Sequence, residues 1–315
     1  PLFTILEDFG YLPRMAFNLD RCFKCCGACG KQSLTLSMGF GCNAVGVTGC
    51  RIIDSKRERL IAMLTNAFVP CNGRFPTLIA LITMFFVGTQ DRKSSGLLAA
   101  FYLSGFIVLS ILITLAVSKI LSVTLLSGVP SSFTLELPPY RKPQIGRVIV
   151  QSVVNRTVFV LFRAVAVAAP AGLIIWLLAN LPFGDGTVVS GIAGVLDPIG
   201  KQLGMDGVIL LAFLLGFPAN EIVMPLMLMI YLSSGTLSEL GSLTEFRQIL
   251  ILNGWTVKTA VCTVLFAMIH FPCSTTCLTI RKESGENRWM IAGFLIPLVV
   301  GMILCFCVNH CWKLF

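Results

Sequence analysis

The sequence predicts an all-α, polytopic helical membrane protein, and three observations support this fold class. Hydrophobic residues make up 56% of the 315 residues and charged residues 12%, about half of the roughly 25% typical of soluble domains. Several apolar runs reach the length of about 20 residues that a helix needs to cross the hydrocarbon core. In both halves proline and glycine interrupt such runs, which a membrane protein tolerates only where the backbone packs in protein or lines a cavity.

In the first half, residues 97–118 form an uncharged run that predicts a membrane-spanning helix. Before it, residues 60–88 predict two short helices separated by the segment 69–76, which holds two prolines and a glycine. Residues 39–51 are too short to cross the bilayer once, so we expect a re-entrant segment there.

In the second half, two runs predict further spans: 157–181, which contains Arg163 and Pro170, and 289–312, which has Trp at each end. Two others, 208–232 and 249–280, are apolar but broken by proline. We therefore expect irregular backbone in these two segments.

Basic clusters predict the topology, because short cytoplasmic loops are rich in Lys and Arg. Residues 51–59, 141–147 and 281–288 are basic, whereas 184–206 holds three Asp against one Lys and is expected to be a loop on the outside. If every predicted span crossed the membrane completely, the basic segment 281–288 would lie outside the cell rather than in the cytoplasm. One proline-broken segment is therefore expected not to cross completely. The resulting division is a first membrane region at 1–135, a basic cytoplasmic connection at 136–156 and a second membrane region at 157–315.

The two halves share short sequence patterns. Gly-Phe-Gly-Cys-Asn at 39–43 aligns with Gly-Phe-Pro-Ala-Asn at 216–220, and Arg-Phe-Pro at 74–76 aligns with His-Phe-Pro at 270–272. Paired interrupted segments are typical of transporters built from repeats, with the binding site at the interruptions.

Three cysteines lie at helix breaks and are the first candidate metal ligands: Cys42, Cys71 and Cys273. Thiolates are soft ligands that suit transition metals and do not suit sodium, magnesium or sugars. The alternative is that each cysteine is a small packing residue.

Other groups at the breaks could assist these cysteines. Glu221 is the only charged residue in 208–232, and an ionisable side chain at membrane depth is expected to face a cavity, a partner or an ion. The structural alternative is an ion pair with Lys258 or Arg163. Candidate oxygen and nitrogen ligands at the breaks are Asn43, Asn72, Asn220 and His270. The alternatives are that the asparagines cap broken helices and that the histidine is a hydrogen-bonded packing residue.

A second cysteine cluster lies near the N-terminus and contains two C-x-x-C spacings. Such spacing can hold zinc or an iron–sulfur centre, or form a labile disulfide. The neighbouring segment 27–33 does not match a phosphate-binding loop, which needs Gly at 25 and Ser or Thr at 32. The cluster consists of Cys22, Cys25, Cys26 and Cys29.

Other classes of function are disfavoured. The net charge of +9 comes from short clusters between apolar runs, so no nucleic-acid-binding face is expected. With two histidines and no fitting catalytic motif, the chain is not expected to be an enzyme.

Several motifs occur in an order and spacing that resemble the membrane domain of the FeoB family, ferrous iron transport protein B. They are Leu-Glu-Asp-Phe-Gly-Tyr-Leu-Pro-Arg-Met-Ala-Phe at 6–17, Gly-Phe-Gly-Cys-Asn at 39–43, Arg-Glu-Arg-Leu at 57–60, Pro-Cys-Asn-Gly-Arg-Phe-Pro at 70–76, Glu-Leu-Pro-Pro-Tyr-Arg at 136–141 and Phe-Pro-Cys at 271–273. The resemblance implies two gate-type repeats, with Cys42, Cys71 and Cys273 at the positions of the iron-path cysteines and 216–221 in the second gate.

The resemblance also implies a function and partners. The chain would move Fe²⁺ into the cytoplasm across the inner membrane of a bacterium, embedded in the lipid bilayer, and a homo-oligomer is compatible with this role. GTP and Mg²⁺ would bind only to an N-terminal domain that precedes this membrane part, as the same polypeptide or a separate subunit. Small accessory iron-transport proteins would be further partners.

Two features depart from the family pattern. Residues 44–46 are Ala-Val-Gly where the family commonly has Val-Pro-Ala, and the cluster at 22–29 is not typical of it. Two rival functions remain open: a nucleoside transporter of the gate type, and a membrane sensor that uses the 22–29 cluster as a metal or redox switch without transporting anything.

Overall fold

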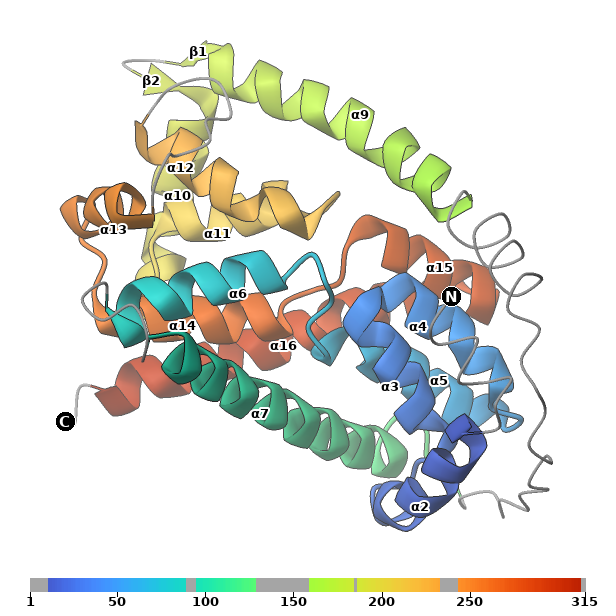
Figure 1. The fold of residues 1–315 in the computed structure, drawn as a ribbon. Coiled ribbons are helices and arrows are strands. Elements are labelled where there is room, and N and C mark those ends of the chain that lie inside the picture. The colour runs from blue at the N-terminus through green and yellow to red at the C-terminus, as the bar shows by residue number, and fades with distance from the viewer. Residues whose placement is uncertain (1–10, 89–94, 129–158, 184–185, 233–242, 313–315) are drawn as a thin grey trace, which may run out of the picture. The chain divides into compact units, whose positions relative to one another are not determined.

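The computed structural model describes residues 11–88, 95–128, 159–183, 186–232 and 243–312. Within these ranges the protein is helical apart from a small hairpin, in which the two-residue strands β1 (Pro182–Phe183) and β2 (Gly186–Thr187) pair antiparallel (Figure 1). The predicted all-α class is confirmed. Residues 6–10 of the motif at 6–17, the motif at 136–141 and the basic connection at 136–156 lie outside the described residues.

The chain divides into two compact units. Unit 1 comprises Pro1–Cys71, Ile111–Val167 and Thr275–Phe294, and unit 2 comprises Asn72–Ser110, Ala168–Ser274 and Leu295–Phe315. Three long apolar helices contribute residues to both units: α7 (Ser95–Val123), α9 (Phe159–Asn180) and α16 (Asn287–Cys311).

Unit 1 is built around short helices that follow one another closely. They are α2 (Tyr11–Cys25), α3 (Lys31–Gly41), α4 (Asn43–Gly49), the 3₁₀ turn η1 (Cys50–Ile52), α5 (Lys56–Thr65), the 3₁₀ turn η2 (Asn66–Phe68) and most of α15 (Ser274–Ser284). Ser55 caps α5 by accepting a hydrogen bond from the Glu58 backbone N–H, the arrangement favoured at helix starts. A buried apolar cluster joins these elements: Cys29, Val47, Cys50, Ile53, Ala62, Met63 and Ile280.

Unit 2 contains the remaining helices. They are α6 (Phe75–Ile82) with its π-helical extension η3 (Thr83–Val87), α10 (Val188–Gln202), α11 (Gly207–Leu215), the 3₁₀ turn η5 (Asn220–Ile222), α12 (Val223–Leu232), α13 (Leu243–Leu252) and α14 (Val257–Ile269). Figure 1 shows α6 beside α14, and these two helices are in contact. Asp206 caps α11 through the Ile209 N–H at 2.7 Å.

Helices α10 and α11 meet at a sharp bend of 111°, a geometry that fits a broken span or a re-entrant loop. Gly207 makes this close approach feasible, because a Cβ there would lie 1.9 Å from the Ala193 carbonyl oxygen. The expected re-entrant geometry in the second half therefore has a candidate, but its bend lies at 203–206 rather than at a proline.

The predicted spans 97–118 and 289–312 are confirmed by α7 and α16, which are long and apolar enough to cross a membrane. The broken stretch Val257–Ser284 meets the same criterion, so the described residues hold three candidate spans, or four if the bent pair counts as one. Large apolar side chains on α7 are exposed, with Leu97 79% and Phe101 74% accessible. Such surface suits lipid contact.

The structure corrects three details of the sequence reading. Residues 184–206, expected to be a loop, are mostly helix α10. The first-half break ends at Arg74, because Phe75 and Pro76 already begin α6, where proline is favoured in the first turn. Consequently 74–76 begins a helix while 270–272 follows the end of one, so these two segments are not structural equivalents.

Candidate functional site

The first break in unit 1 separates α3 from α4 at a single extended residue. Cys42 has φ −155° and ψ 122°, and its side chain is partly exposed. Its N–H donates to the Met38 carbonyl at 3.0 Å, and its own carbonyl accepts from the Gly46 N–H at 3.0 Å. Cys42 thus occupies a hydrogen-bonded interruption between two helices.

Two asparagines hold this break in place. With its amide oriented to satisfy its neighbours, Asn43 Nδ2 donates to the carbonyls of Gly39 at 3.0 Å and Val69 at 3.2 Å. Asn66 Nδ2 donates to the Asn43 carbonyl at 3.0 Å. Because Val69 lies two residues before the buried Cys71, these bonds bring the two breaks of unit 1 together.

The equivalent break in unit 2 follows α11. Ala219 adopts φ −151° and ψ 113°, nearly the values of Cys42, and the buried Asn220 follows it as Asn43 follows Cys42. The backbone at Ala219 therefore matches that at Cys42, as the predicted alignment of 39–43 with 216–220 requires. The Ser274 N–H donates to the Phe217 carbonyl at 2.9 Å, which ties this break to the one that contains Cys273.

Glu221 lies beside Asn72 and Gly73, the part of the 69–74 interruption that belongs to unit 2. A Cβ on Gly73 would lie 3.1 Å from Glu221 Cγ and 3.3 Å from its Oε1, so the carboxylate side chain passes over the glycine backbone. Both Glu221 and Asn72 are exposed. Among the described residues no ion pair joins Glu221 to Lys258, so the structural alternative of that pair is not observed.

Arg74 connects the same interruption to the end of α14. Its side chain is 1% exposed, and its guanidinium donates to three backbone carbonyls: Met268 at 2.7 Å, His270 at 2.8 Å and Phe271 at 3.0 Å. These carbonyls lack helical partners because α14 ends at Ile269, and a cation is favoured at the negative end of a helix.

His270 is buried among aromatic rings. Its Nδ1 lies 3.1 Å and 3.0 Å from the carbonyls of Phe266 and Ala267, so Nδ1 carries the proton and Nε2 keeps a lone pair. That Nε2 is buried and has no hydrogen-bond partner among the described residues. The rings of Phe213, Phe266 and Phe271 surround it, so an ion could reach Nε2 only after these rings move.

The structure therefore groups the predicted site residues by unit: Cys42, Asn43 and Cys71 in unit 1, and Asn72, Asn220, Glu221, His270 and Cys273 in unit 2. Within the described ranges, no three His, Cys, Asp or Glu side chains lie close enough to hold a metal ion.

Sequence reasoning missed the roles of Asn66 and Arg74. The signal for Arg74 was a lone cation inside an apolar segment, which implies a buried partner. No comparable feature of the sequence distinguishes Asn66, because a polar residue near a helix end is usually interpreted as a helix cap.

The four N-terminal cysteines differ in solvent exposure. Cys22 and Cys25 are exposed near the end of α2 and Cys26 is half-buried, whereas Cys29 is buried. Burial, reinforced by the nearby Glu58 charge, raises the pKa of Cys29 to about 11, so it remains a protonated thiol at neutral pH. A metal or redox role for the four stays a prediction.

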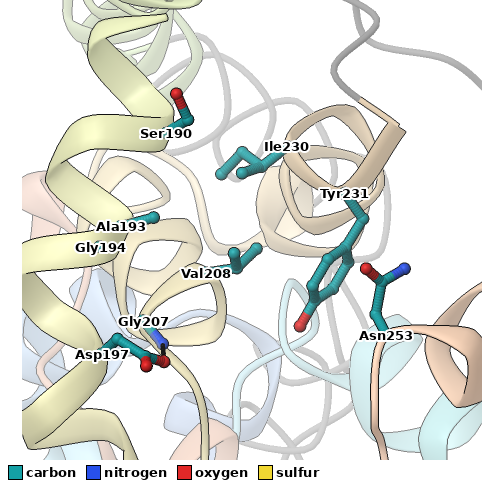
Figure 2. A pocket seen from close by; sticks show the side chains of 9 residues that line it. All are labelled: Ser190, Ala193, Gly194, Asp197, Gly207, Val208, Ile230, Tyr231 and Asn253. Atoms are coloured by element: carbon teal, nitrogen blue, oxygen red, sulfur yellow. Dashed lines mark hydrogen bonds between the residues drawn. The ribbon is translucent and has the colours of Figure 1, made fainter. Parts of the chain in front are cut away.

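A pocket of about 370 Å³ lies in unit 2 between α10, α11 and α12 (Figure 2). Polar groups on its wall include Asp197 and Tyr231, and Asn253 lies just beyond α13. Asp197 Oδ1 accepts from the Gly207 N–H at 3.2 Å. The Tyr231 hydroxyl donates to Asp206 and accepts from Trp255 Nε1.

Two family models match the chain. One, described as "Nucleoside recognition", covers residues 1–86 and 161–287, more than half of the chain, and the other, "Ferrous iron transport protein B C terminus", covers 103–154. No solved structure matches significantly.

Curated relatives cover nearly the whole chain. The Fe(2+) transporter FeoB of Staphylococcus aureus (strain MSSA476) is 29% identical over 99% of this chain, and that of Campylobacter jejuni is 26% identical over 99%. A Porphyromonas gingivalis protein named as a fusion of Fe(2+) transport protein A with FeoB is 26% identical over 99%. The chain spans about half the length of these relatives, 45%, 51% and 41% respectively. The chain belongs to the FeoB family and corresponds to its membrane portion, with the gate domains and the FeoB C-terminal segment.

Proposed function

We propose that this chain moves Fe²⁺ across the inner membrane of a bacterium into the cytoplasm. Cys42 and Cys71 in unit 1, and Cys273 and Glu221 in unit 2, act as transient ligands. The amide oxygens of Asn72 and Asn220 replace part of the ion's hydration shell.

The observation that supports this most is the position of the cysteines. Cys42 is the extended residue between α3 and α4, while Cys71 and Cys273 each follow a proline after a helix end. Soft thiolates favour a transition metal over Na⁺ or Mg²⁺. The similarity of the chain to relatives named as Fe(2+) transporters suggests which metal.

Sparse ligation suits a transport path. An ion must bind well enough to enter and weakly enough to leave, which several incomplete sites achieve better than one saturated site. The lack of any group of three strong ligand side chains in the described ranges is consistent with this requirement.

We propose that partners outside this chain control the opening of the transport path. A GTP-binding domain or subunit, with its Mg²⁺, would gate the membrane part, and a small accessory protein would assist. The second partner is suggested by the P. gingivalis relative, whose name joins transport protein A to FeoB.

The test is anaerobic Fe²⁺ flux into proteoliposomes. We expect flux with the native chain, a large loss in the Cys42→Ser, Cys71→Ser, Cys273→Ser triple variant, and no change in Cys307→Ser, which alters an exposed thiol on α16. Undiminished flux in the triple variant at equal membrane abundance would refute the ligand roles. Absence of flux even with the GTP-binding part supplied would refute the transport function.

A nucleoside is the second candidate substrate, because the gate model that matches is described as "Nucleoside recognition". Asparagine and glutamate at the breaks could then contact ribose and base. Competition of nucleosides with Fe²⁺ in the same assay, or nucleoside uptake insensitive to the cysteine substitutions, would favour this alternative.

A further inference from the structure

We propose that the pocket between α10, α11 and α12, here called the vestibule, binds a divalent cation with its hydration shell intact before the ion reaches the helix breaks. This inference rests on the proposed transport function, since it names an earlier binding site for the same ion. The vestibule is lined by Ser190, Ala193, Gly194, Asp197, Gly207, Val208, Ile230, Tyr231 and Asn253.

The size of the vestibule suits a hydrated ion. Its volume is about 370 Å³. A water molecule occupies about 30 Å³ in the liquid, so six coordinated waters need roughly 180 Å³. The pocket therefore has room for an ion with its first shell and some further solvent.

The polar groups of the vestibule are suited to accept hydrogen bonds. Water bound to a divalent ion acts as a donor, and Asp197 offers a carboxylate. The Tyr231 hydroxyl donates its hydrogen bond to Asp206 and accepts one from Trp255, so one lone pair of the hydroxyl oxygen stays available. Asn253 Nδ2 donates to the Ile249 carbonyl at 2.9 Å, so its Oδ1 is the remaining group, and Figure 2 shows that oxygen on the side of Tyr231.

The charge of Asp197 can be made available to an ion. Its Oδ2 lies 2.5 Å from Lys201 Nζ, but the Lys201 side chain is 73% exposed. Exposed ion pairs contribute only weakly to stability, because water screens them and the long side chain loses freedom. A divalent ion can therefore displace the lysine, while Oδ1 keeps its hydrogen bond from the Gly207 N–H.

The vestibule lies at one end of a helix whose other end leads to a break. Gly207 begins α11, and the break at 219–221 follows Leu215. The 9 residues of α11 span about 13 Å. Residues 184–206 are also the segment whose acidic composition predicts an outside location, where an incoming ion is still hydrated.

Cobalt(III) hexaammine is the probe, because its six ammonia ligands do not exchange and it can bind only through its outer shell. We expect it to bind the detergent-purified chain in equilibrium dialysis. For a trivalent complex about 5 Å from a carboxylate, removing the negative charge weakens binding roughly tenfold at physiological salt and more at low salt. Asp197→Asn should therefore lose about tenfold in affinity, whereas Asn keeps the acceptor for Gly207.

Two further variants sharpen the test. Lys201→Gln removes the competitor of the ion and should tighten binding by about twofold to fivefold. Asp54→Asn is the matched control, because Asp54 also pairs with a lysine, Lys31, but belongs to unit 1 and does not line the vestibule. It should leave binding unchanged.

In the flux assay, Asp197→Asn should raise the KM for Fe²⁺ without lowering kcat, and hexaammine should inhibit the native chain competitively. Failure of hexaammine to bind the native chain would overturn the proposal that the vestibule binds a cation. Equal binding by the Asp197→Asn and Asp54→Asn variants would overturn it as well. Binding that follows Asp197 in a chain that transports no Fe²⁺ would uphold the vestibule as a cation site and refute the proposed function instead.

Discussion

Replacement of Arg74 by Met removes a buried guanidinium while keeping an unbranched apolar stem of similar shape. In the native protein Arg74 donates to the carbonyls of Met268, His270 and Phe271 at 2.7, 2.8 and 3.0 Å. The substitution leaves these three carbonyls at the end of α14 without that donor, around a side chain that is buried in the native protein.

The expected magnitude follows from two opposing terms. Hydrogen bonds from a charged donor contribute about 1.5–3 kcal/mol each, so three amount to about 5–9 kcal/mol. Burying the guanidinium costs several kcal/mol, which the Met variant no longer bears. We therefore expect the free energy of unfolding to fall by about 2–5 kcal/mol. Arg74→Lys keeps the charge without the planar fork and should fall between Met and the native residue.

The assay is unfolding of the purified protein by titration with a denaturing detergent. Arg288→Met is the matched control, because Arg288 is an exposed arginine paired with Glu286, and its loss should cost less than about 1 kcal/mol. If Arg74→Met proves as stable as Arg288→Met, the three carbonyls find other donors, and Arg74 does not stabilise the end of α14.

Three further outcomes are expected. Gly73→Ala should reduce Fe²⁺ flux by about tenfold through displacement of Glu221, with little change in stability because that side chain can move; unchanged flux would contradict the placement of Glu221. Gly207→Ala should lower the unfolding free energy by about 3 kcal/mol or more, because its Cβ meets a backbone carbonyl of α10 at 1.9 Å, and a native-like melting temperature would count against this. The hydrogen bond and charge of Lys31 lower the pKa of Asp54, so this exposed pair stabilises the fold above about pH 4 by at most about 0.5 kcal/mol and loses that as pH falls through the folded pKa. Asp54→Asn should abolish that part of the acid dependence, which acid melting curves of both proteins would reveal.

Much of the fold and of the candidate site follows from local sequence. The uncharged run at 97–118 predicts α7, because a long apolar segment in lipid must satisfy its backbone internally. Proline and glycine likewise mark the breaks near Cys71 and Cys273, since proline lacks the donor that would continue a helix. Composition does not identify helix α10, because its three glycines and its proline are residues typical of a loop, whereas packing against α11 stabilises it as a helix.

Local patterns are therefore enough to predict the membrane class, the helix breaks and the cysteines at those breaks, because apolar length and proline chemistry act within a few neighbouring residues. Which breaks lie together depends on how the helices pack. The guanidinium of Arg74 reaches carbonyls 194 to 197 residues away, and Asn43 reaches Val69. Such contacts arise from the packing of whole helices, and no local pattern encodes the partner. The same reason explains the vestibule, whose walls come from helices that the chain brings together only on folding.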